Sequence, residues 1–165
     1  MADKITNVLF LCTGNSARSI MAEALLDRLG GGRFKGFSAG AHPTGRPNGH
    51  ALALLQSHGF DTGFAASKSW DEFAGDRAPV MDFVITVCGD AAEESCPVWP
   101  GHPAPAHWGI ADPAAATGSD DEIRAAFQKA FDRLAKAIAK FRKIPMGAMD
   151  ADQLAARLAD IGRRI

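Results

Sequence analysis

Two short and almost wholly apolar segments predict interior strands of a parallel sheet. They cover residues 5–11 and 81–87, and both are rich in β-branched and other large apolar side chains. A parallel sheet that is covered on both faces buries such strands completely, so the alternation of polar and apolar positions is lost. The pattern also predicts a strand over residues 34–39 and a short one at His107 and Trp108.

Apolar positions at helical spacing separate these strands. A first helix is predicted around Ile20, and the glycines at 30–32 end it. A second helix is expected to have Pro47 at its first position and to end at Gly59. Strand, helix and strand within about 35 residues are typical of a right-handed βαβ unit, and the alternation predicts an α/β protein with a mostly parallel sheet.

The last part of the chain is predicted to be helical. Ser119 and Glu122 have the spacing of a capping box and open a long helix that Pro145 ends. Residues 1–144 are expected to form the main domain, and residues 145–165 a helical extension packed on it. The alternative is that the extension packs against a partner. Its apolar stripe consists of Leu154, Leu158, Ile161 and Ile165.

Composition and charge narrow the class of protein. The chain has 165 residues, of which 47% are hydrophobic and 22% charged, so a single globular domain is expected. A formal net charge of -1 gives no basic excess for nucleic acid or an anionic membrane surface. The apolar run of residues 8–11 is too short for a signal peptide core or a membrane span. These features favour a cytoplasmic protein.

The loop from Cys12 to Ser19 joins the first strand to the first helix. Backbone N–H groups converge at a helix N-terminus, where they favour a tetrahedral anion and stabilise a thiolate. Gly14 and Asn15 tolerate the left-handed backbone that such a loop needs, and Arg18 can bind two oxygens of the anion. The alternative is a tight turn with a buried cysteine. The expected oxyanion-binding residues are Thr13, Gly14, Asn15, Ser16, Ala17, Arg18 and Ser19.

Two further cysteines follow the second buried strand. Cys88 comes directly after it, and seven residues separate Cys88 from Cys96. If this strand lies beside the first one, Cys12 and Cys88 face the same crevice at the carboxyl ends of the strands. Three thiols within reach of one another permit successive thiolate attacks through disulfides. The alternatives are two inert cysteines, or a zinc site that also uses His102 and His107.

Asp112 and Pro113 lie in a proline-rich loop. A carboxylic acid there can protonate a departing oxygen if the loop lies over the bound anion. The alternative is that Asp112 only initiates an Asp-Pro turn.

These residues resemble a known family. Residues 8–19 and the Asp112–Pro113 pair are similar to the low-molecular-weight protein tyrosine phosphatases, and the resemblance covers residues 5–142. Three further segments narrow it to the thioredoxin-coupled arsenate reductases, a branch with two additional redox cysteines. These segments are residues 87–92, 96–97 and 107–109.

The resemblance implies a three-layer α/β sandwich with a four-stranded parallel sheet in the order 2-1-3-4. It also implies an enzyme that reduces arsenate to arsenite, with phosphate or sulfate as substrate analogues and no cofactor. Some members hold a potassium ion near the positions that match Asn15, Glu23 and Ser38, but Lys68 falls close to another ligand position here, so we expect no metal. Cys12 would attack arsenate held by the loop and Arg18, while Asp112 protonates the leaving oxygen. Cys88 would then attack Cys12 and release arsenite. Cys96 would attack Cys88 and leave a disulfide for thioredoxin to reduce.

Two other functions are compatible with parts of this pattern. A phosphatase acting on phosphate monoesters would need only Cys12, Arg18 and Asp112. The phosphatases usually carry an aromatic residue after the Asp-Pro pair, whereas this chain has Ala114. A non-catalytic anion sensor on the same fold is the third possibility.

Overall fold

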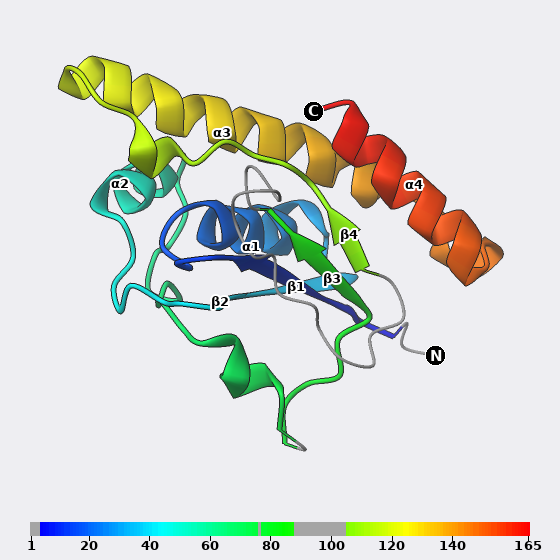
Figure 1. Cartoon of the computed structure of the whole chain (residues 1–165). Helices are drawn as coiled ribbons and strands as arrows, with labels where there is room; N and C mark the ends of the chain where they lie inside the picture. The colour runs from blue at the N-terminus through cyan, green and yellow to red at the C-terminus, as the bar shows by residue number, and fades with distance from the viewer. Residues whose placement is uncertain (1–3, 76, 88–104) are drawn as a thin grey trace.

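The computed structural model describes residues 4–75, 77–87 and 105–165. Four parallel strands form one sheet in the order β2-β1-β3-β4, which confirms the expected order 2-1-3-4 (Figure 1). The strands are β1 (Thr6–Cys12), β2 (Phe34–Gly40), β3 (Phe83–Thr86) and β4 (Pro105–His107). The helices are α1 (Arg18–Leu29), α2 (Gly49–Ser57), α3 (Asp120–Phe141) and α4 (Ala151–Arg163). Three short 3-10 helices are η1 (Trp70–Phe73), η2 (Pro113–Ala115) and η3 (Met146–Ala148).

The two faces of the sheet have different covers. Successive residues of β1 point to opposite faces, so Val8 and Phe10 pack in the main core with residues of α1, α2, α3 and α4. Leu9 and Leu11 pack on the other face, in a smaller cluster with residues of η1 and its surroundings. All four of these β1 side chains are fully buried. The layers are therefore helices, sheet and an irregular layer around η1 (Figure 1).

The register of the sheet brings three strand ends together. Cys12 pairs with Gly40 of β2, and Leu11 pairs with Thr86 of β3. The backbone N–H of Val87 donates to the Leu11 carbonyl at 2.8 Å. The predicted adjacency of the first and third strands is therefore confirmed. Cys88 and Cys96 lie outside the described residues, as does His102 of the zinc alternative.

The start of α2 differs from the prediction. The helix begins at Gly49, and Pro47 lies before the cap instead of at the first helical position. Asn48 is the N-cap, because its side-chain oxygen accepts a hydrogen bond from the His50 N–H at 2.8 Å. The Asn48 N–H itself donates to the carbonyl of Ser16 at 2.8 Å, so the cap also joins α2 to the loop after β1.

The expected capping box at the start of α3 is only half formed. Ser119 Oγ accepts a hydrogen bond from the Glu122 N–H, but the Glu122 carboxylate accepts from the Ser119 hydroxyl and not from its backbone. A complete capping box opens α4 instead, between Asp150 and Gln153.

Helix α4 lies against the end of β4. Its residues Leu158 and Ile161 are buried in the main core. The indole N–H of Trp108 donates to the Leu158 carbonyl at 3.1 Å. A Cβ atom on Gly162 would come within 2.7 Å of the His107 carbonyl oxygen, so only glycine fits at this contact. In the segments that the structure describes, no helix combines the length and apolar character needed to cross a bilayer.

Candidate active site

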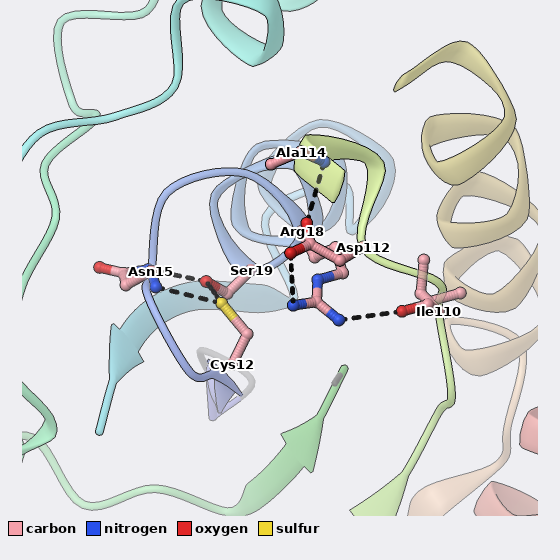
Figure 2. Close-up of polar contacts among 7 residues, drawn as sticks. All are labelled: Cys12, Asn15, Arg18, Ser19, Ile110, Asp112 and Ala114. Carbon is pink, nitrogen blue, oxygen red and sulfur yellow. Dashed lines mark hydrogen bonds and ion pairs between the residues drawn. The ribbon is translucent and has the colours of Figure 1, made fainter. Parts of the chain in front are cut away.

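Cys12 is the last residue of β1 and is almost completely buried, with 2% of its surface exposed. Its Sγ receives two polar contacts, one from the Asn15 backbone N–H at 3.2 Å and one from Ser19 Oγ at 2.9 Å (Figure 2). Hydrogen-bond donors that point at sulfur stabilise a thiolate, which is the nucleophilic form of cysteine.

Asn15 fixes the direction of the Ser19 hydroxyl. The Asn15 side-chain oxygen accepts from the Lys68 backbone N–H at 2.8 Å, so its amide nitrogen faces Ser19. That nitrogen donates to Ser19 Oγ at 2.7 Å. Because the hydroxyl oxygen accepts this bond, its single hydrogen is available to the Cys12 sulfur.

Asn15 holds the turn of the loop. Its φ of 45° lies in the left-handed region, as predicted. The same prediction for Gly14 is wrong, since the described residues with positive φ do not include it. Gly14 lies close to Thr44 instead, since a Cβ there would be 3.1 Å from the Thr44 methyl carbon and this side chain would have to shift slightly.

The segment after β2, residues 41–48, orients the peptide groups of the loop that follows Cys12. The carbonyls of Thr13, Gly14 and Ser16 each accept a hydrogen bond from it. The donors are the backbone N–H groups of His42, Thr44 and Asn48, at 2.8, 3.0 and 2.8 Å respectively. In a trans peptide the C=O and N–H point in opposite directions. The N–H groups that follow these carbonyls are therefore directed into the loop, toward a bound anion.

The N-terminus of α1 is prepared for an anion in a second way. Ala17 occupies its N-cap and provides no side-chain cap, and the first turn holds no acidic residue. The other three α-helices in the described part of the chain are capped by Asn48, Ser119 and Asp150. The N–H groups and dipole at the start of α1 are therefore left to serve a ligand.

Arg18 and Asp112 meet above this loop. Arg18 is the first residue of α1 and only 5% exposed, and its Nη1 donates to the Ile110 carbonyl at 3.0 Å. Its Nη2 lies 3.7 Å from Asp112 Oδ2 (Figure 2). Asp112 also caps η2, because its Oδ1 accepts a hydrogen bond from the Ala114 N–H at 3.0 Å. Asp112 therefore both initiates the Asp-Pro turn and lies beside Arg18 at the Cys12 loop.

An open cavity of about 390 Å³ lies over these groups. The predicted site residues Cys12, Arg18 and Asp112 line it together. Four of the expected oxyanion-binding residues join them, namely Thr13, Gly14, Ser16 and Ala17. The other two, Asn15 and Ser19, are fully buried beneath the loop. The cavity can hold a tetrahedral anion between a thiol on its floor and a carboxyl group at its rim.

Several residues of the site were missed by sequence reasoning. His42 and Thr44 line the cavity from the segment after β2. A Cβ on Gly40 would lie 2.6 Å from the Thr13 carbonyl oxygen, so glycine is required where β2 passes the loop. Ser67 donates to the Gly14 carbonyl at 3.0 Å. The only local signal for these residues was the run of small residues at the end of the second strand. That run does not show which segment packs against it.

Glu23 is a buried carboxyl group on α1, near the site but outside its cavity. Burial raises the pKa of Glu23, while a hydrogen bond from the Ser38 hydroxyl and the charge of Lys68 partly oppose this shift. Among the described residues, no group of three or more His, Cys, Asp or Glu side chains is arranged to hold a metal ion.

Comparison with known proteins agrees with this geometry. The arsenate reductase of Bacillus subtilis (strain 168) is 38% identical over 141 residues, which cover 86% of this chain and 96% of that protein. The crystal structure of an arsenate reductase from Archaeoglobus fulgidus is similar with a TM-score of 0.62 and 30% identity, over 79% of this chain and 98% of that one.

A thioredoxin-dependent arsenate reductase of Corynebacterium glutamicum is also similar, with a TM-score of 0.56 and 28% identity, over 81% of this chain and 60% of that one. Residues 7–153 match the family described as low molecular weight phosphotyrosine protein phosphatase. The chain belongs to this family.

Proposed function

We propose that this protein is an arsenate reductase that uses a cysteine nucleophile and a disulfide relay. The observation that carries the proposal is the Cys12 thiol, held by Ser19 and the Asn15 N–H on the floor of an anion cavity, opposite Arg18 and Asp112. The similarity to curated arsenate reductases over most of the chain supports the choice of substrate.

In the first step, the Cys12 thiolate attacks arsenic and an arsenic–oxygen bond breaks. The departing oxygen leaves as water after it takes a proton from Asp112. Arg18 and the loop N–H groups hold the remaining oxygens, whose negative charge matches the uncapped end of α1. The product is a covalent Cys12–arsenic(V) adduct.

In the second step, the Cys88 thiolate attacks the Cys12 sulfur. The electron pair of the sulfur–arsenic bond moves to arsenic, which leaves as arsenite, and a Cys12–Cys88 disulfide forms. Cys96 then attacks Cys88, frees the Cys12 thiolate and leaves a Cys88–Cys96 disulfide. Thioredoxin supplies the two electrons that reduce it. The hydrogen bond from Val87 to Leu11 supports this order, because it places the chain just before Cys88 beside the end of β1.

Phosphate ester hydrolysis is the second candidate function, since it needs the same loop, arginine and aspartate. At the position after the Asp-Pro pair the cavity is lined by Ala114, and no Phe, Tyr or Trp is among the described residues that line it. A phenyl ring would therefore find little stacking surface there. This feature favours a small inorganic oxyanion over phosphotyrosine.

The test compares two activities of the same preparation. We expect repeated turnover of arsenate to arsenite with thioredoxin, thioredoxin reductase and NADPH, and weak hydrolysis of p-nitrophenyl phosphate. Efficient hydrolysis without arsenite formation would overturn the reductase in favour of the phosphatase. Absence of both activities, with retained anion binding, would favour the sensor. The proposal includes a cytoplasmic location, where a reducing environment supports a thiol relay.

A further inference from the structure

A second, smaller cavity lies behind the loop that carries Asp112. Its volume is about 210 Å³, and it forms where residues 110–113 run along α3 (Figure 1). The cavity is lined on the α3 side by Ala126, Lys129, Ala130 and Arg133. Among the residues that the structure describes, only Asp112 lines both this cavity and the one above Cys12.

The shape of this cavity follows from the sequence of α3. Ala130 and Pro113 are buried, and the small Ala126 and Ala130 side chains leave a hollow beneath the loop. Lys129 and Arg133 are four residues apart, so they project from the same face of the helix and flank this hollow.

Lys129 and Arg133 have no anionic partner among the described residues. Across the described parts of the chain, neither Lys129 nor Arg133 forms an ion pair or a side-chain hydrogen bond. Asp132, which precedes Arg133, instead accepts a hydrogen bond from Gln128 at 2.8 Å. Arg133 is half-buried, and a partly desolvated guanidinium that lacks a partner favours a bound anion.

Asp112, the one acidic residue in the described lining of the cavity, does not cancel these charges. Asp112 accepts a hydrogen bond from the Ala114 N–H, and its other oxygen lies 3.7 Å from Arg18. Two cations therefore face a single carboxylate that is already engaged, and the lining keeps a net positive charge.

We infer that this cavity binds a small tetrahedral oxyanion of the phosphate and sulfate class. The planar fork of Arg133 can hold two of its oxygens, and the Lys129 ammonium can hold a third as a point charge. A volume of about 210 Å³ suits an inorganic ion rather than a nucleotide. The inference does not rest on arsenate reduction, since it concerns residues outside the Cys12 cavity.

Such a ligand would lie next to the catalytic loop. Residues 110–113 form one wall of its site, and they include both the Ile110 carbonyl that accepts from Arg18 and the Asp112 carboxyl group. The bound ion would therefore hold this loop against α3.

The test is a titration of isotope-labelled protein with inorganic phosphate at constant ionic strength, followed by NMR. Amides of residues 13–17 report on the Cys12 cavity, and amides of residues 126–133 report on the second one. We expect two separate saturation curves. Lys129→Ala with Arg133→Ala should raise the Kd of the second curve at least about tenfold and change the first less than about twofold.

The matched control is Lys136→Ala with Lys140→Ala, which removes the same charge from exposed positions of α3 and should change neither curve. Lys129→Gln with Arg133→Gln repeats the test if the alanine variant is poorly folded. The inference is overturned if the α3 amides do not shift. It is also overturned if the α3 amides titrate with the same Kd as the amides of residues 13–17 in every variant. Binding of acetate to the second cavity as tightly as phosphate would overturn it as well.

Discussion

Arg18 Nη2 lies 3.7 Å from Asp112 Oδ2, although the two residues are 94 positions apart in the sequence. Arg18 starts α1 after the loop that follows Cys12, and Asp112 precedes η2 on the loop after β4. An anion held by Arg18 would therefore have an oxygen next to the Asp112 carboxyl group. In the mechanism that we propose, this carboxyl group protonates the departing oxygen.

Arg18→Lys should lower kcat/KM for arsenate at least about tenfold. Lysine keeps the charge, but it lacks the planar guanidinium fork whose fixed donors can serve two anion oxygens and the Ile110 carbonyl together. Steady-state kinetics with thioredoxin measures the effect. Arg28→Lys, near the other end of α1, is the control and should keep normal turnover. Near-normal activity of Arg18→Lys would show that the loop N–H groups alone bind the anion.

Ser19→Ala should slow the reaction of Cys12 with iodoacetamide at pH 7 about tenfold. The Ser19 hydroxyl lies 2.9 Å from Sγ, and a hydrogen bond to a charged group contributes about 1.5–3 kcal/mol. The rate is followed by mass spectrometry of the Cys12 peptide. Ser57→Ala on α2 should leave it unchanged. An unchanged rate in Ser19→Ala would mean that this contact does not stabilise the thiolate.

Cys96→Ser should reduce about one arsenate per protein and then stop as a Cys12–Cys88 disulfide. Cys88→Ser should release essentially no arsenite, because nothing then attacks the Cys12 adduct, while any weak phosphatase activity persists. Arsenite released in a single turnover and disulfide mapping by mass spectrometry measure both results. Many thioredoxin-supported turnovers by Cys96→Ser would contradict the three-cysteine relay.

The free energy of unfolding should fall as the pH rises above about 4.5, the ordinary pKa of Glu23. Burial raises the pKa of this carboxyl group in the folded state, so the folded protein binds its proton more tightly than the unfolded chain does. The stabilisation is complete below 4.5 and is lost as the pH passes through the raised value.

Urea unfolding of Glu23→Gln between pH 4 and 8 tests this dependence. In Glu23→Gln, the fall of the free energy of unfolding with rising pH should lose the part that Glu23 contributes. Glu122→Gln, at an exposed position of α3, should keep the wild-type dependence on pH. Identical slopes in wild type and Glu23→Gln would contradict the assignment to Glu23.

Leu158→Ala should lower the free energy of unfolding by about 2–5 kcal/mol, because the side chain is fully buried in the main core. Arg157→Ala, at the exposed neighbouring position, should change it by less than about 0.5 kcal/mol. A single unfolding transition in both variants would support the prediction that residues 145–165 pack on the same domain as residues 1–144. A separate early transition would show that the extension unfolds independently.

The sequence by itself determined the elements that depend on local physics. The apolar run before Cys12 predicted β1, because a strand buried on both faces cannot carry alternating polar residues. The loop after it was predicted as an anion site, because its glycine, asparagine and arginine stand between a strand and a helix. The helical stripe with Leu158 and Ile161 predicted α4.

Only the tertiary structure decided which distant segments complete the site. His42 and Thr44 line the cavity because β2 ends beside β1, and no spacing along the chain encodes that adjacency. Gly14 has no left-handed backbone and lies close to Thr44, a neighbour that only the packed structure brings to it. Asp112 reads as an ordinary Asp-Pro turn in the sequence. It reaches Arg18 only because η2 packs on α3 and carries the loop over the end of α1, a contact fixed by long-range packing.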